Sequence, residues 1–99
     1  MIPDIVTKLA SKLSPKLRKR GFQKMTHRET KALDEIGFKS KEGIRIFVAE
    51  DCENGYPAVT VEGFVGPSRC SVRKYCFSTM VATAAHVLER VDNLLELNV

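Results

Sequence analysis

Residues 44–65, IRIFVAEDCENGYPAVTVEGFV, decide the fold because two apolar runs flank a strong turn signal. Asn54 and Gly55 can supply the two positive φ angles that a type I′ hairpin turn requires. Alternation of apolar and polar residues on both sides of the turn is typical of strands with one buried face. We therefore expect an antiparallel hairpin with strands at 44–50 and 57–65.

The two faces of this hairpin differ in character. With the turn centred on Asn-Gly, Val48 lies opposite Val61, and one face is aliphatic throughout. The reverse face carries Arg45, Phe47 and Phe64. The sequence therefore predicts one face for the core and one face that mixes aromatic and charged side chains.

A third strand and a long helix follow the hairpin. Gly66 and Pro67 turn the chain, and alternation over 69–77 brings Arg73 and Tyr75 onto the mixed face. The aliphatic side of this strand then carries Cys70, Val72 and Cys76. From residue 78 onward, apolar residues at helical spacing predict a helix along the aliphatic face. The members of this stripe are Met80, Ala84, Val87, Leu88, Val91, Leu94 and Leu95.

Helical spacing also marks the start of the chain. Apolar residues recur at three- and four-residue intervals over 3–13, which predicts an amphipathic helix. Ser14 and Pro15 form an N-cap and first-turn pair, so we expect the helix to break there and to restart over 16–20.

A capping box begins a further helical region. Thr26 and Glu29 can each satisfy a free backbone donor at a helix start, and Gly37 can take the left-handed conformation that ends a helix. We therefore expect a helix over 27–36. The resulting fold class is α+β with the element order ααβββα: N-terminal helices, a three-stranded antiparallel meander and a long C-terminal helix packed on one sheet face. The 99 residues make a single domain.

Charge is divided by position along the chain. Residues 1–31 hold nine Lys and Arg against two acids, a balance of +7, and residues 32–99 hold seven against ten, a balance of −3, so the net charge is +4. Such asymmetry is typical of a basic segment that meets a polyanion. We expect residues 1–24 to be this segment, either docked on the domain or free as a mobile arm. Either this segment or a partner could neutralise Asp92 and Glu96, whose charges oppose the dipole of the last helix.

Composition and motif spacing argue against an enzyme, a metal site and a membrane span. The three cysteines and two histidines lack the short spacings of zinc sites, and the acidic turn at 50–55 lacks the alternating ligands of a calcium loop. Cys70 and Cys76 would lie about 20 Å apart along one strand, too far to bridge, and are better read as small buried hydrophobes. No apolar run approaches the roughly 20 residues of a membrane helix. We expect a cytoplasmic, non-enzymatic protein without a cofactor or a metal.

The mixed sheet face and the basic segment together suggest a nucleic-acid-binding protein. Rings hold unpaired bases by stacking, while guanidinium and ammonium groups neutralise phosphates. The predicted stacking surface consists of Arg45, Phe47, Phe64, Arg73 and Tyr75. The predicted phosphate contacts are Lys16, Arg18, Lys19, Arg20 and Lys24. Alternatively, the N-terminal helices cover this face and bury its rings.

A second function fits the same features. A small protein without catalytic residues could be a phage or mobile-element modulator that binds a host nucleic-acid-processing enzyme, for instance at an acidic surface of that enzyme. The predicted contacts to such a partner are Ile5, Leu9, Leu13, Leu17, Gly66 and Pro67. A prolyl isomerase that grips the Gly66-Pro67 bond and a homodimer formed through a sheet edge are further candidate partners.

Overall fold

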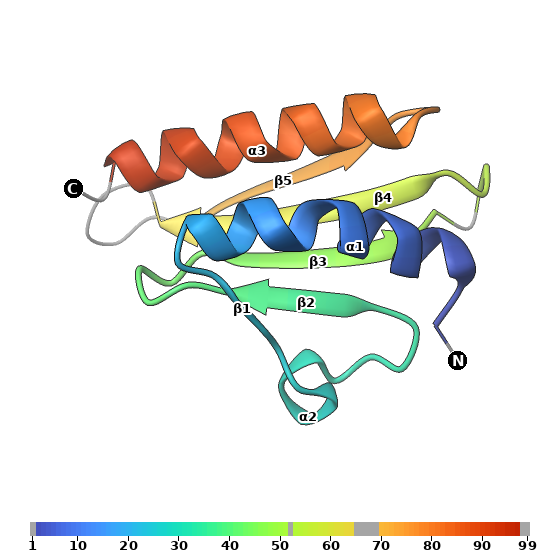
Figure 1. Cartoon of the computed structure of the whole chain (residues 1–99), viewed down its shortest axis with the longest axis horizontal. Helices are drawn as coiled ribbons and strands as arrows, with labels where there is room; N and C mark the ends of the chain where they lie inside the picture. Colours follow the sequence, from blue (N-terminus) through green and yellow to red (C-terminus); the bar gives the residue numbers. More distant parts are fainter. Residues whose placement is uncertain (1, 52, 65–69, 98–99) are drawn as a thin grey trace.

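The chain forms two layers, a five-stranded antiparallel sheet and two long helices on one of its faces (Figure 1). The computed structural model describes residues 2–51, 53–64 and 70–97, with the side chain of Phe64 outside the described part. In chain order the elements are α1 (Asp4–Lys19), β1 (Gln23–Lys24), α2 (His27–Thr30), β2 (Ile36–Lys39), β3 (Arg45–Glu50), β4 (Pro57–Phe64), β5 (Cys70–Cys76) and α3 (Met80–Leu97). The α+β class and the C-terminal helix are confirmed. The three-stranded meander is wrong, because the strands follow one another as β1-β2-β3-β4-β5.

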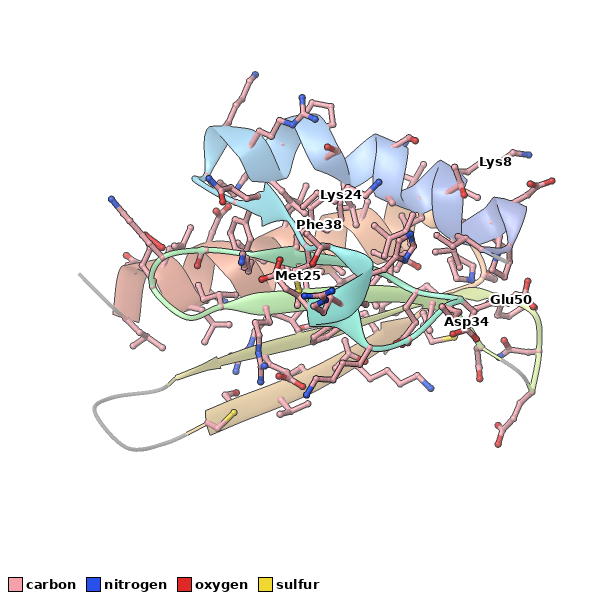
Figure 2. All side chains as sticks on the ribbon, turned by 90° about the horizontal axis from the view of Figure 1, so that it is seen from below. Lys8, Lys24, Met25, Asp34, Phe38 and Glu50 are labelled. Carbon is pink, nitrogen blue, oxygen red and sulfur yellow. The ribbon has the colours of Figure 1, made fainter. Side chains whose placement is uncertain are left out.

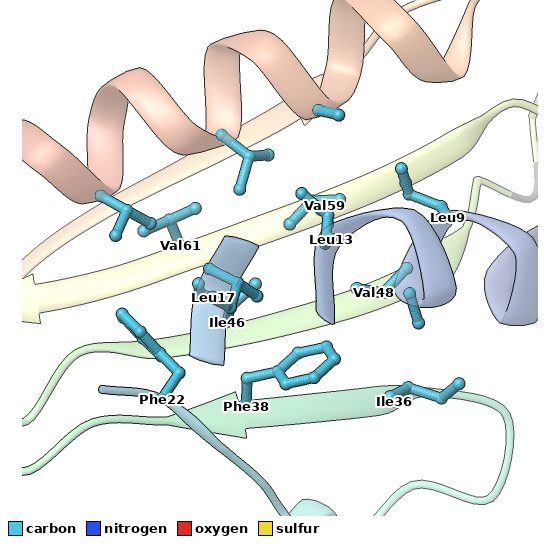
Figure 3. Packing of buried hydrophobic residues seen from close by; sticks show 14 of the residues in the cluster. Leu9, Leu13, Leu17, Phe22, Ile36, Phe38, Ile46, Val48, Val59 and Val61 are labelled. Carbon is cyan, nitrogen blue, oxygen red and sulfur yellow. The ribbon is translucent and has the colours of Figure 1, made fainter. Parts of the chain in front are cut away.

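The core lies between the aliphatic side of the sheet and both long helices. Ile46 pairs with Val61 and Val48 with Val59, and all four side chains are fully buried. Figure 3 shows the leucines of α1 packed among these residues, with the aromatic rings of Phe22 and Phe38 on the β2 side of the cluster. From α3, the buried contributors are Ala84, Val87, Val91 and Leu94. One sheet face therefore serves two helices, and the other face has neither α1 nor α3 on it (Figure 1).

The hairpin register is shifted by two residues from the predicted one. Val48 faces Val59 rather than Val61, because the turn is wider than two residues: the Asp51 N–H donates to the Tyr56 carbonyl at 2.8 Å. Gly55 has a φ of 70°, but Asn54 is not among the positive-φ residues of the described chain, so the turn is not type I′. A shift of two keeps every side chain on its predicted face.

The register between β4 and β5 is shifted by one residue, which reverses the faces of β5. Arg73 pairs with Val61 and Tyr75 with Val59, so both residues lie on the helix-covered side of the sheet. Conversely, the side chains predicted for the helix-covered side point to the uncovered face. These residues are Cys70, Val72 and Cys76. Exposed Cys70 and half-buried Cys76 correct the expectation of buried cysteines. Gly66 and Pro67, which set this connection, lie outside the described residues.

The helix predicted over 27–36 is only four residues long. Its capping box is confirmed, since the Glu29 N–H donates to Thr26 Oγ1 at 3.2 Å and the Thr26 N–H donates to Glu29 Oε1 at 3.1 Å. Lys31, not Gly37, takes the left-handed conformation, with a φ of 62°. Gly37 lies instead in β2, where a Cβ on it would come within 2.7 Å of Met25 Sδ. Glycine here permits a close approach between segments and does not end a helix.

The break predicted at Ser14-Pro15 is absent, and α1 is continuous. Leu13 and Leu17, on either side of Pro15, are one helical turn apart and fully buried. Burying each leucine is worth about 1.5–3 kcal/mol, comparable to the cost of about 3 kcal/mol for an interior proline. Pro15 itself is exposed, so water can reach the backbone carbonyl that its ring leaves without a helix bond.

Truncating Leu13 should destabilise the fold, because its side chain fills the space between α1 and the sheet. We expect Leu13→Ala to lower the free energy of unfolding by about 2–5 kcal/mol in a urea titration. Leu33→Ala is the matched control, since Leu33 is 77% exposed and should change stability by less than about 0.5 kcal/mol. Equal effects of the two substitutions would contradict this placement of α1.

Amide exchange tests whether residues 1–24 remain docked in solution. Because α1 contributes five buried residues to the core, we expect its central amides, around Leu9 to Leu17, to exchange as slowly as those of β3 and β4. Exchange of these amides at rates close to those of an unfolded peptide, with β3 and β4 still protected, would show instead a mobile arm.

Candidate functional site

The outer side of α1 carries a row of lysines, which we call the α1 basic face. It consists of Lys8, Lys12, Lys16 and Lys19. Intervals of four, four and three residues keep these side chains within one stripe of the helix, about 6 Å apart along the axis for each four-residue step. All four are exposed, while the opposite side of the helix is buried on the sheet. Figure 2 shows Lys8 projecting from this outer side.

The lysines of this face have no acidic partner among the described residues. The ion pairs found there involve other cations, namely Arg20, Lys39, Arg45 and Lys74. A stripe of four like charges is unfavourable to the isolated protein, since lysines one turn apart repel each other by a few tenths of a kcal/mol. An anionic partner would remove this repulsion.

Arg18 and Lys24, two of the predicted phosphate contacts, lie beside this face. They line a hollow of about 170 Å³ between α1 and the β1-β2 side of the sheet, with Ser11, Ser14 and Phe38. Figure 2 shows Lys24 next to Phe38 there. Both cations are exposed and outside the ion pairs of the described residues, so they can add to the positive potential of α1.

Arg20 has a different environment from its neighbours. Its Nε and Nη2 donate to the two carboxylate oxygens of Asp92 on α3, at 2.6 and 3.0 Å, and its Nη1 donates to the Lys16 carbonyl at 2.9 Å. The hydrogen bond to Asp92 raises the pKa of Arg20, and the same bond lowers the pKa of Asp92. Of the two possibilities for Asp92, neutralisation by the basic segment is the one that the structure shows. Arg20 therefore joins the two helices, and three of its five N–H donors are already in use.

The uncovered side of the sheet, called here the open face, holds only part of the predicted stacking surface. Arg45 donates to Glu62 at 2.7 Å, and Phe47 is half-buried beside it. Adjoining hollows of about 310 and 350 Å³ share Glu35 and Thr60 along this face. The alternative that the N-terminal helices cover this face is wrong for α1, which packs on the aliphatic side, while Thr30 at the end of α2 lines one of these hollows. The side chain of Phe64, also predicted for this surface, lies outside the described part of the chain.

Arg73 and Tyr75 are separated from the open face by the register of β5. Tyr75 packs against the core from its side, with its ring centroid 6.2 Å from that of His86 on α3 and 6.5 Å from that of Phe77. Arg73 is exposed on the same side of the strand. The nine predicted contact residues with described side chains therefore occupy three places: α1 with its neighbouring strand β1, the open face, and the outer flank of β5 and α3.

The residues predicted for a protein partner are mostly part of the core. Leu9, Leu13 and Leu17 are fully buried, and Ile5 packs partly buried against them. They can contact a partner only if α1 leaves the sheet. The other two predicted contacts, Gly66 and Pro67, lie outside the described residues, as does the surface that a prolyl isomerase would grip.

The soft and acidic side chains do not assemble a reaction centre among the described residues. The Cys76 thiol donates to Asp51 Oδ2 at 3.4 Å, and burial together with this carboxylate raises the pKa of Cys76, which opposes formation of a nucleophilic thiolate. His86 stacks on Phe77. In that part of the chain no three His, Cys, Asp or Glu side chains converge as metal ligands. No described helix is both long enough and apolar enough to reach across a bilayer.

Sequence reasoning missed four residues that the structure brings into these surfaces. Lys8 and Lys12 were counted in the charge balance but not among the phosphate contacts, although their spacing from Lys16 already indicates a common stripe. Phe77 and His86 join Tyr75 only because α3 packs beside β5, and no local pattern indicates that contact. Comparisons with protein-family models, curated proteins and solved structures find nothing that matches this chain.

The Arg20–Asp92 pair should make stability depend on pH. Because the folded pKa of Asp92 lies below its unfolded value of about 3.9, the pair stabilises the fold above about pH 4, and this contribution disappears as the pH falls through the folded pKa. We expect Asp92→Asn to cost less than about 1 kcal/mol at pH 7, since the pair is partly exposed. Urea titrations at several pH values should show the difference from the unsubstituted protein closing as the pH is lowered below about 4. A constant difference across that range would contradict the assignment.

Proposed function

We propose that this protein is a small, non-enzymatic nucleic-acid-binding protein whose α1 basic face contacts the phosphate backbone. The observation that carries the proposal is the unpaired stripe of Lys8, Lys12, Lys16 and Lys19 on a helix that is already folded and docked. Arg18 and Lys24 extend the same positive surface toward β1. Six cations on α1 and the adjoining β1, none of them in an ion pair of the described residues, are the electrostatic footprint expected of a phosphate-binding surface.

Docking of α1 supports this proposal energetically. A cationic arm that orders only on binding loses conformational entropy at that moment, which lowers its affinity. Here Leu9, Leu13 and Leu17 hold the helix on the sheet before any partner arrives. The repulsion among the lysines is already present in the free protein, so neutralisation by phosphates contributes directly to affinity.

The same geometry favours binding with little sequence preference. Lysine recognises phosphate as a point charge, and phosphate contacts position a protein on nucleic acid without reading bases. Affinity should therefore fall steeply with salt and change little with base sequence.

The modulator hypothesis has less support from these contacts. Three of the four apolar side chains assigned to a partner on α1 are fully buried within the chain itself. A protein partner with an acidic surface would meet the same α1 basic face as a nucleic acid, and the two partners differ in whether binding survives nuclease treatment.

Neutralising α1 should weaken nucleic-acid binding more than neutralising an equal charge elsewhere. We expect the triple substitution Lys8→Gln, Lys12→Gln, Lys16→Gln to reduce duplex affinity at least tenfold at about 50 mM salt, and to reduce the slope of log K against log salt by about 2.7. Fluorescence anisotropy with a labelled duplex measures both quantities.

The matched control removes three exposed cations from other parts of the surface, with Arg28→Gln, Lys31→Gln and Lys41→Gln. This variant has the same net charge, so it corrects for the general loss of attraction. Equal loss of affinity in the two variants would argue against a localised site. Absence of binding by the unsubstituted protein at low salt would overturn the proposed function.

A further inference from the structure

Three aromatic rings gather where β5 meets the outer side of α3. The Phe77 and His86 rings stack with centroids 4.5 Å apart and planes inclined by 16°. Tyr75 lies beside this pair, at 6.5 Å from Phe77 and 6.2 Å from His86, with its plane inclined by 21° to each. All three ring faces therefore point in nearly the same direction. Together with Arg73, we call these residues the aromatic flank.

The position of the flank follows from the register of β5. Residues two apart on a strand share a side, so Arg73, Tyr75 and the following Phe77 line the helix side of the sheet edge. Because β5 is the last strand of the sheet, nothing in the described chain pairs beyond it. His86 is exposed, and Tyr75 and Phe77 are half-buried, so the rings border solvent at the edge of the molecule.

Arg73, two residues before Tyr75 on the same side of β5, supplies a cation next to the rings. Arg73 is exposed and forms no ion pair within the described residues, in contrast to Arg45 and Lys74 on the other side of the sheet. Arg90 of α3 donates to the Ser71 hydroxyl, which places a second guanidinium at the same edge. Parallel ring faces next to a guanidinium are the combination that holds an unpaired base together with its phosphate.

We propose that the aromatic flank stacks an unpaired base of a single-stranded nucleic acid, with Arg73 contacting the adjoining phosphate. The inference rests on the proposed function and adds a preference for single strands over duplexes. Bases in a duplex are stacked on one another and cannot reach a ring at a sheet edge, so duplex binding would use only the α1 basic face. Neutralisation of Asp92 by Arg20 removes one negative charge from α3, which lies between the two surfaces.

Paired affinity measurements separate the flank from α1. Single-stranded and duplex oligonucleotides of one sequence are titrated against the unsubstituted protein and against His86→Gln, Arg73→Gln and Tyr75→Leu. We expect each substitution to weaken single-strand binding about fivefold or more and to change duplex binding less than twofold. His86 and Arg73 are exposed, so these two variants keep the fold even where Tyr75→Leu loosens the core edge. Tyr56→Leu, at an exposed tyrosine in the β3-β4 turn, is the matched aromatic control.

Unchanged single-strand affinity in the His86 and Arg73 variants would overturn the flank proposal, while loss of binding in the α1 triple variant would leave the proposed function standing. Titration with adenosine 5′-monophosphate, followed by amide and ring proton shifts, tests the flank without any polymer. We expect shifts confined to residues 73–77 and 86. If the protein binds no oligonucleotide, the proposed function fails, and absence of these nucleotide-induced shifts then rejects the flank as well.

Discussion

Burial of one aliphatic sheet face beneath two helices is the constraint on which the rest of the structure depends. Ile46, Val48, Val59 and Val61 all point to that face, and leucines from α1 and valines from α3 complete the same core. Because both long helices pack on the same face of the sheet, neither of them is available to cover the other face. The position of every charged surface follows from this arrangement.

Docking gives α1 two roles that its sequence combines in a single helix. Its apolar side holds the helix through an interior proline, because Leu13 and Leu17 remain in phase across Pro15 and are fully buried. Its lysines consequently face solvent in a fixed row, while Arg20 links the end of the helix to Asp92. A basic segment that is also a structural element can present charge without an ordering step, which favours rapid, salt-sensitive association with a polyanion.

The surfaces proposed to bind nucleic acid were only partly predictable. The charge asymmetry and the spacing of the lysines can both be read directly from the sequence, so the sequence was enough to infer the basic side of the molecule. The predicted grouping of Arg73 and Tyr75 on one face with Arg45 and Phe47 was wrong, because one residue of register in β5 moves Arg73 and Tyr75 to the opposite side of the sheet. His86 and Phe77 lie beside Tyr75 because α3 packs next to the end of β5. A contact between such distant segments cannot be seen in a short stretch of sequence.

The sequence by itself determined the α+β class, the β3-β4 hairpin with its aliphatic side, the capping box at Thr26 and the C-terminal helix, since each depends on periodicity or capping within a few neighbouring residues. Only the tertiary structure decided that Ile36 to Lys39 form a strand, that α1 runs through Pro15, and which way β5 faces. These outcomes depend on which distant surface each segment buries. The free energy of that burial exceeds the local preference of a proline, a glycine or a short apolar run.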